Sequence, residues 1–238
     1  MNKKIIDKSE TQVYNKFTSE SGHWYTQEGE PMYTIIGVNG KERNTNLRDA
    51  KLLNLVPSVT TVMDLIAKPS LENWKINQAL NSALSLEQED GESDGSFIYR
   101  CKQEAKKPGM EAADLGTKIH AMIERGFLGQ STNKPYKAVR KYLDEHYPDE
   151  TWIAEDSFCA SQGYGGMIDL YSESGIFVDF KTKDNLERVS IFVDRKQTDL
   201  ISCYIWDQES HEKHLAMFNS ILTYWKLSKN YDPAGELI

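Results

Sequence analysis

The sequence has few cysteines and no long apolar segment. Its three cysteines, Cys101, Cys159 and Cys203, are far apart and show no paired spacing, so neither a disulfide framework nor a zinc or iron–sulphur site is predicted. The first residues lack the apolar stretch of a signal peptide, and no apolar run is long enough to span a bilayer. These absences predict a soluble, cytoplasmic protein that does not associate with membranes.

The sequence also lacks an excess of basic residues. Its 238 residues carry a formal net charge of -8. A protein that coats nucleic acid without reading its sequence is normally basic, because it neutralises phosphates. The acidic balance argues against such a coat, but it is compatible with an enzyme that gathers carboxylates at a metal site. From the length we predict an N-terminal hairpin and helical region over residues 1–110, packed on a core over residues 111–238.

Residues 163–183 predict two short strands joined at a Ser-Glu-Ser-Gly turn. The first strand carries Asp169, and the second carries Asp179 and Lys181. Because side chains alternate faces along a strand, Asp179 and Lys181 point the same way. If the strands pair as a hairpin, Asp169 reaches the same patch. Two carboxylates and one cation around a single point make a site for a divalent metal and a phosphate.

The alternative for these charges is a solvated strand face with a weak surface ion pair. The apolar run over residues 176–178 favours the functional interpretation. A charge such as Asp179 at the end of a buried strand is costly unless it is paired or bound to metal.

The N-terminal half predicts a small antiparallel hairpin over residues 23–38 and a short helix over residues 48–55. Ser58 or Thr60 is well placed to cap a helix over residues 62–67. Free amides at such a helix start can hold a phosphate, although a plain cap is the simpler interpretation. Another helix is predicted to begin at Pro69.

A long helical pattern then runs to about residue 126, and we expect an interruption at Pro108. In its second half His120 and Glu124 are four residues apart and share a helix face. The alternative to a metal-ligand role for His120 is that of a hydrogen-bonded residue at the boundary of the core. A basic helix ending near Pro148 comes next, and its cations either contact phosphate or form an ordinary solvated face.

The remaining elements complete an alternation of strands and helices. Residues 152–159 predict the first core strand, which carries Glu155. Residues 189–193 and 200–206 are β-branched or aromatic and predict two more strands. Residues 214–226 predict a final amphipathic helix.

Three motifs follow one another along the chain: Gly116-Thr117-x-x-His120-x-x-x-Glu124, Gly166-x-x-Asp169 and Asp179-x-Lys181. In this order they resemble the PD-(D/E)xK nuclease superfamily, specifically its RecB-like branch, which includes phage exonucleases and the mitochondrial genome-maintenance exonuclease. Residues 47–75 and 218–233 also look like parts of phage and prophage exonucleases. The resemblance covers most of the chain from about residue 23 onward.

The resemblance implies an α/β fold with a restriction-endonuclease-like core, in which a central mixed sheet is flanked by helices. It implies a metal-dependent DNA exonuclease that hydrolyses phosphodiester bonds in phage recombination, replication or repair. The implied ligands of Mg²⁺ or Mn²⁺ are His120, Asp169, Asp179 and the carbonyl of Phe180.

By the same resemblance, Lys181 orients the attacking water, and Glu155 or Glu124 completes a second metal site or holds a metal-bound water. The implied partner is DNA, as single strands or duplex ends, and a phage single-strand annealing or binding protein is a further candidate. The residues expected to contact DNA are Ser58, Thr60, Trp74, Lys75, Thr117, Lys118, Lys137, Arg140 and Lys183.

The chain departs from this branch in one respect. A helix with a Gln and a Tyr usually follows the Asp-x-Lys strand there and lines the DNA channel. Here only residues 182–188 separate Lys181 from the next predicted strand, and Gln197 and Tyr204 have the wrong spacing, so we predict that the helix is absent. Two alternatives stay open: a structure-specific endonuclease of the same superfamily, and a DNA-binding protein that keeps the fold with weakened cleavage.

Overall fold

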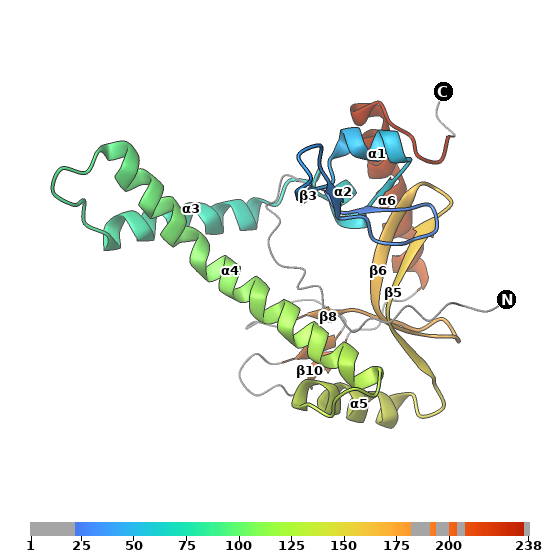
Figure 1. The fold of residues 1–238 in the computed structure, drawn as a ribbon. Helices are drawn as coiled ribbons and strands as arrows, with labels where there is room; N and C mark the ends of the chain where they lie inside the picture. Colours follow the sequence, from blue (N-terminus) through green and yellow to red (C-terminus); the bar gives the residue numbers. More distant parts are fainter. Residues whose placement is uncertain (1–21, 182–190, 194–199, 204–207, 236–238) are drawn as a thin grey trace.

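The computed structural model describes residues 22–181, 191–193, 200–203 and 208–235, which form a mixed α/β structure of small sheets and helices. A long antiparallel hairpin, β5 (Trp152–Ala160) and β6 (Tyr164–Ser172), runs between two regions of the molecule (Figure 1). Each region has its own buried core. No helix among the described residues is long and apolar enough to cross a bilayer.

The first region is built from both ends of the described chain. Strand β1 (Trp24–Tyr25) pairs with β4 (Val56–Pro57), next to the helices α1 (Leu47–Leu53), α2 (Val59–Met63) and α6 (Gln208–Lys229). Buried side chains from these elements form what we call the α1–α6 core: Trp24, Ala50, Leu55, Val62, Phe218, Leu222 and Trp225. The helices predicted over residues 48–55 and 214–226 are therefore confirmed.

The hairpin predicted over residues 23–38 is confirmed in part. Tyr25 and Pro31 form an isolated antiparallel bridge, flanked by backbone hydrogen bonds from Thr26 to Glu30 and from Met32 to Trp24. The regular hairpin consists of β2 (Thr34–Ile36) and β3 (Glu42–Asn44). The apolar β1 also pairs with β4, and both strands are buried.

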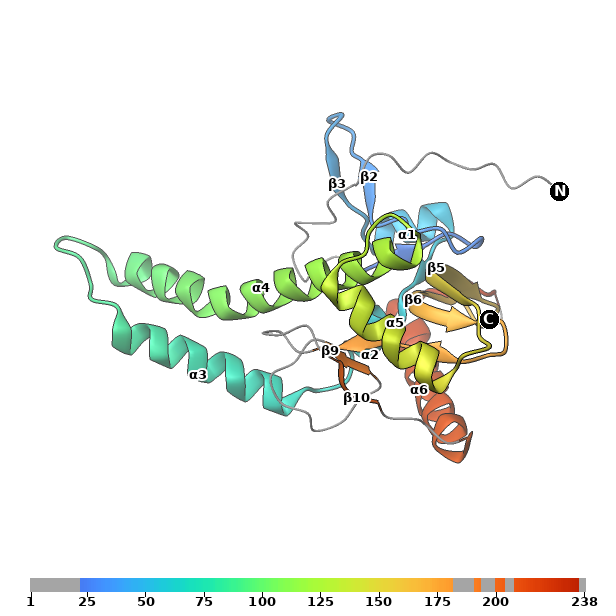
Figure 2. The same cartoon turned by 90° about the horizontal axis from the view of Figure 1, so that it is seen from below.

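Helices α3 (Pro69–Ser85) and α4 (Asp94–Phe127) pack on each other and project from the body as a two-helix arm (Figures 1 and 2). The predicted interruption at Pro108 is wrong, since α4 continues through it. A proline there removes one backbone hydrogen bond. Pro108 lies on the exposed side of α4, and the adjacent Gly109 faces Trp74 of α3. Because α4 crosses residue 110, the predicted domain boundary lies inside a helix, and the division itself stays a prediction.

The second region holds the α4–α5 core. Helix α5 (Lys134–His146), which the sequence predicted, packs on the end of α4. The buried residues of this core come from both helices, from β6 and from the strands after it: Ile119, Ile123, Val139, Leu143, Leu170, Val178 and Phe180. On both helices the apolar residues are four apart, so they share a face.

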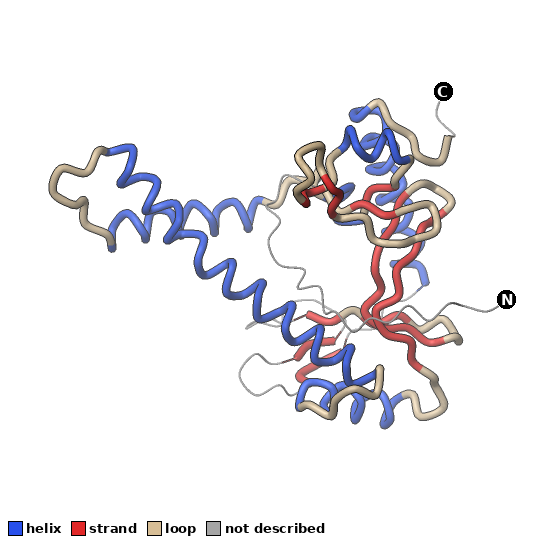
Figure 3. Tube along the Cα trace, viewed as in Figure 1, coloured by secondary structure: helices blue, strands red, loops and turns tan. Residues whose placement is uncertain are grey.

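The strands after β6 change partners at Asp179. Strand β7 (Phe177–Val178) pairs antiparallel with β6 through the predicted turn. The next strand, β8 (Phe180–Lys181), pairs parallel with β9 (Ile191–Val193), which pairs antiparallel with β10 (Leu200–Cys203). Figure 3 shows these short strands beside the end of α4. The strands predicted near residues 189–193 and 200–206 are confirmed within the described residues.

Candidate metal centre

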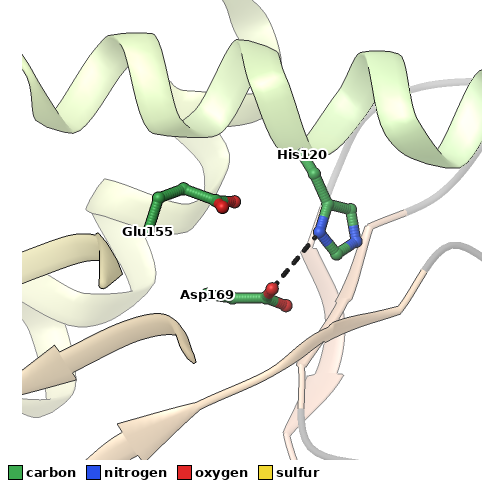
Figure 4. A group of neighbouring side chains, drawn as sticks. All are labelled: His120, Glu155 and Asp169. Atoms are coloured by element: carbon green, nitrogen blue, oxygen red, sulfur yellow. Dashed lines mark ion pairs between the residues drawn. The ribbon is translucent and has the colours of Figure 1, made fainter. Parts of the chain in front are cut away.

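Three side chains from three elements meet at the base of the arm (Figure 4). His120 comes from α4, Glu155 from β5 and Asp169 from β6. One ligand atom of each residue lies within 4.8 Å of the other two. All three residues are partly buried, so the group is accessible from solvent but is held by the fold.

The register of the long hairpin explains why the two carboxylates face each other. Ala154 pairs with Leu170 and Asp156 pairs with Ile168, which places Glu155 opposite Asp169. Glu155 has a φ of 51°, in the left-handed region that residues other than glycine rarely adopt. Such backbone strain persists only where the surrounding structure imposes it, and it is concentrated at functional sites.

Asp169 is held as a carboxylate by two neighbours. Its Oδ2 accepts a hydrogen bond from the Phe180 backbone N–H at 2.7 Å, and its Oδ1 lies 3.5 Å from His120 Nδ1. Burial disfavours the charged carboxylate, but the hydrogen bond and charge of His120 and the Phe180 amide outweigh it, so the pKa of Asp169 is lowered.

His120 shows the complementary effect. Burial disfavours the imidazolium, but the hydrogen bond to Asp169 and the negative charges of Asp169 and Glu155 outweigh burial, and the pKa of His120 is raised. The phenyl ring of Phe180 also contacts the imidazole edge-on, with ring centroids 5.9 Å apart. The centre therefore favours positive charge between its two carboxylates, which a proton on His120 or a metal ion can supply.

Two carboxylates and one imidazole around a single point fit a divalent metal. The oxygens suit Mg²⁺, and the nitrogen makes Mn²⁺ equally suitable. Of the predicted ligands, the structure thus brings together His120 and Asp169. It adds Glu155, for which the sequence predicted only an auxiliary role.

Asp179 does not belong to this group of three. Its carboxylate lies 2.6 Å from Lys181 Nζ, and its side chain is 52% exposed. This ion pair confirms that Asp179 and Lys181 point the same way. The reason for the separation is the change of sheet, because Asp179 is the residue between β7 and β8. Its role as a ligand stays a prediction, as does that of the Phe180 carbonyl.

The remaining catalytic candidates lie close by. The positive charge of Lys181 acts on both His120 and Asp169, opposing protonation of each. Glu124 follows His120 by one helical turn and is partly buried, but it is not part of the group of three.

The cap predicted at Ser58 is confirmed, although α2 spans Val59–Met63 rather than the predicted residues 62–67. The Ser58 hydroxyl accepts a hydrogen bond from the Thr61 backbone N–H at 3.0 Å and also contacts the Thr60 hydroxyl at 3.1 Å. With only 2% of its surface exposed, Ser58 is part of the fold around α2. Thr60 is exposed, and its contact with DNA stays a prediction.

The other predicted DNA contacts are scattered over the helices. On the arm, Lys75 pairs with Glu72 at 2.8 Å, and Trp74 is 40% exposed beside Gly109. On α4, the Thr117 hydroxyl donates a hydrogen bond to the carbonyl of Ala113, and Lys118 is exposed. On α5, Lys137 is exposed, and Arg140 pairs with Asp144 at 2.7 Å. Lys183, Gln197, Tyr204 and the segment of the predicted missing helix lie outside the described residues.

Comparisons with protein-family models, with curated proteins and with solved structures find no match for the chain. The function is therefore inferred from the geometry of the site and the chemistry of its residues.

Proposed function

We propose that this protein is a divalent-metal-dependent nuclease that hydrolyses phosphodiester bonds in DNA, most simply as an exonuclease. The observation that carries the proposal is the convergence of His120, Glu155 and Asp169, with one ligand atom of each within 4.8 Å of the others. These residues come from a helix and two neighbouring strands, and Lys181 adds a cation at the end of a third strand.

Each residue has a role that its position supports. Asp169, fixed by the Phe180 amide, and Glu155, opposite it on β5, supply oxygen ligands, and His120 supplies a nitrogen. A Mg²⁺ or Mn²⁺ ion held there would lower the pKa of a bound water and stabilise charge on the scissile phosphate. The Lys181 ammonium would bind a phosphate oxygen or orient the water.

In this proposal Asp179 controls the availability of the lysine. Its carboxylate lies 2.6 Å from the Lys181 ammonium in this structure. If Asp179 turns toward the centre as a further ligand, the ion pair opens and Lys181 becomes available to the phosphate. An exposed ion pair of this kind contributes little stability, so opening it costs little.

The arrangement of strands supports a restriction-endonuclease-like core. Strands β5, β6 and β7 are antiparallel neighbours, and the chain continues directly into β8, which is parallel to β9. The two three-stranded sheets, β5–β6–β7 and β10–β9–β8, thus include antiparallel and parallel pairs, and α4 and α5 cover the buried residues of β6 to β8. In the proposal, these two sheets correspond to the central mixed sheet of such a core.

The second candidate is a DNA-binding protein with weak or no cleavage. The exposure of Asp179 and its pairing with Lys181 favour it, because both residues are then outside the centre. It predicts metal binding at His120, Glu155 and Asp169 without release of nucleotides.

The deciding experiment is a time course on end-labelled single- and double-stranded DNA with Mg²⁺, Mn²⁺ or EDTA. Wild-type protein is compared with Asp169→Asn, Lys181→Ala and Glu173→Gln, the last being an exposed carboxylate on the β6–β7 turn. We expect metal-dependent release of short products by wild type and Glu173→Gln only. Equal release by Asp169→Asn would refute the site, and absence of cleavage with retained DNA binding would favour the second candidate.

A further inference from the structure

Two aromatic residues lie beside the candidate metal centre on the β6–β7 pair. Tyr171 is directly opposite Phe177, and the two rings are nearly parallel, at 21°, with centroids 6.1 Å apart. Phe177 is 61% exposed, although its neighbour Val178 is buried in the α4–α5 core. Exposed aromatic area of this kind is not needed for the described core.

Strand geometry places this aromatic pair close to the predicted ligands. Tyr171 follows Asp169 by two residues on β6, so their Cα atoms are about 7 Å apart. Phe177 on β7 precedes Asp179, the residue after the strand, by two. The residues between them are buried in the α4–α5 core, and side chains alternate along a strand. The aromatic rings are therefore on the side of the sheet that carries the carboxylates.

The tyrosine ring is fixed in place. The Tyr171 hydroxyl donates a hydrogen bond to Asp156 Oδ2 at 2.9 Å. Asp156 follows the strained Glu155, and the same local backbone thus positions a metal-ligand candidate and the partner of Tyr171. A ring that is already ordered loses little conformational entropy when a ligand stacks on it.

We propose that Tyr171 and Phe177 form a stacking platform for an unpaired nucleobase next to the phosphate that the metal centre binds. The proposal rests on the nuclease function above and specifies its substrate as single-stranded DNA or a frayed end. Every base has a flat face that stacks on an aromatic ring, largely independent of sequence. In a duplex those faces are covered by neighbouring base pairs, so the platform selects strands that are not paired.

The test measures binding rather than cleavage. Fluorescence anisotropy with labelled single-stranded oligothymidylate is recorded in EDTA and, in parallel, with Mn²⁺ on the Lys181→Ala background. We expect Phe177→Ala to weaken binding by about 5- to 150-fold, the range for losing one stacked base. Phe177→Trp should bind within about twofold of wild type, because it keeps an aromatic face.

Matched controls separate stacking from other effects. Phe177→Leu keeps an apolar side chain and should bind as weakly as Phe177→Ala, whereas Tyr224→Ala, at an exposed aromatic on α6, should bind like wild type. On oligonucleotides with abasic sites the Phe177→Ala effect should disappear. Wild-type binding by Phe177→Leu, an equal loss on abasic DNA, or no single-strand binding by wild type under either condition would overturn the platform.

The two proposals fail in distinguishable ways. Cleavage that depends on Asp169 but has the same KM in wild type and Phe177→Ala would keep the nuclease and remove the platform. Binding that depends on Phe177 without cleavage in any metal would keep the platform and remove the nuclease.

Discussion

The metal centre predicts that Mn²⁺ stabilises the folded protein and that Glu155 is needed for this effect. A ligand that binds only the folded state, present at 100 times its Kd, adds about 2.7 kcal/mol to the free energy of unfolding. For a protein of this length, 1 kcal/mol shifts Tm by about 2–4 °C. We therefore expect Mn²⁺ to raise Tm by about 5–11 °C.

Glu155→Gln removes one charged oxygen ligand while keeping the size of the side chain. Loss of a residue that only supports a metal ligand already weakens affinity by about 10- to 100-fold, and loss of a ligand should cost no less. If affinity falls about 100-fold, the same Mn²⁺ concentration adds only about 0.4 kcal/mol, or about 1–2 °C in Tm.

The assay is thermal unfolding followed by circular dichroism, with EDTA and with a series of Mn²⁺ concentrations. Glu173→Gln is the matched control, since it removes an exposed carboxylate of the same kind away from the centre. If Glu155→Gln keeps the full Mn²⁺ shift, Glu155 is not a ligand. If wild type shows no shift at any concentration, the group of three does not hold this metal.

Three further changes test the strain, a buried ion pair and an acidic titration. In EDTA, the Glu155→Gly variant should have an unfolding free energy about 1 kcal/mol higher than the Glu155→Ala variant, because a left-handed backbone favours glycine. Urea titration measures both values, and equal values would contradict the strain. Lys226→Met should lower the unfolding free energy by about 3–5 kcal/mol in the same assay, since it removes the cation that lies 2.8 Å from the buried Asp232 carboxylate. A double variant with Asp232→Leu should recover most of this loss. The hydrogen bond from Arg43 lowers the pKa of Asp49 below its usual 3.8, against the opposing effect of burial. The stabilisation that the Asp49 carboxylate gives the folded protein is therefore complete above pH 3.8 and is lost as the pH falls through the lower folded pKa. A stability advantage of wild type over Asp49→Asn that is unchanged between about pH 7 and pH 2 would contradict this.

The sequence predicted those parts of the site that depend on local periodicity. His120 lies on a helix whose apolar residues at Ile119 and Ile123 recur every four positions, and Asp169 lies on an alternating strand, so both the elements and the facing could be predicted. The opposed position of Glu155 depends on the register of two strands, and its left-handed backbone has no signal in the residue type.

Other differences have the same origin in tertiary packing. The exposure of Asp179 results from a change of sheet between Val178 and Phe180, which an apolar run of that length does not reveal. The pairing of β1 with β4 joins two buried segments that are about thirty residues apart in the sequence. The proximity of Tyr171 and Phe177 depends on the β6–β7 register. In the sequence, the only indication of this register was the predicted pair of alternating strands on either side of the turn.

The three grouped residues differ from Asp179 in how the fold holds them. His120 follows the buried Ile119, and Asp169 precedes the buried Leu170, which pairs across the hairpin with the residue before Glu155. Each ligand candidate is thus adjacent in sequence to a residue of the α4–α5 core or to its direct cross-strand partner. The positions of the ligands are therefore set by packing before any metal binds. Metal affinity should depend on the charge and reach of these side chains, and little binding energy is spent on ordering the backbone.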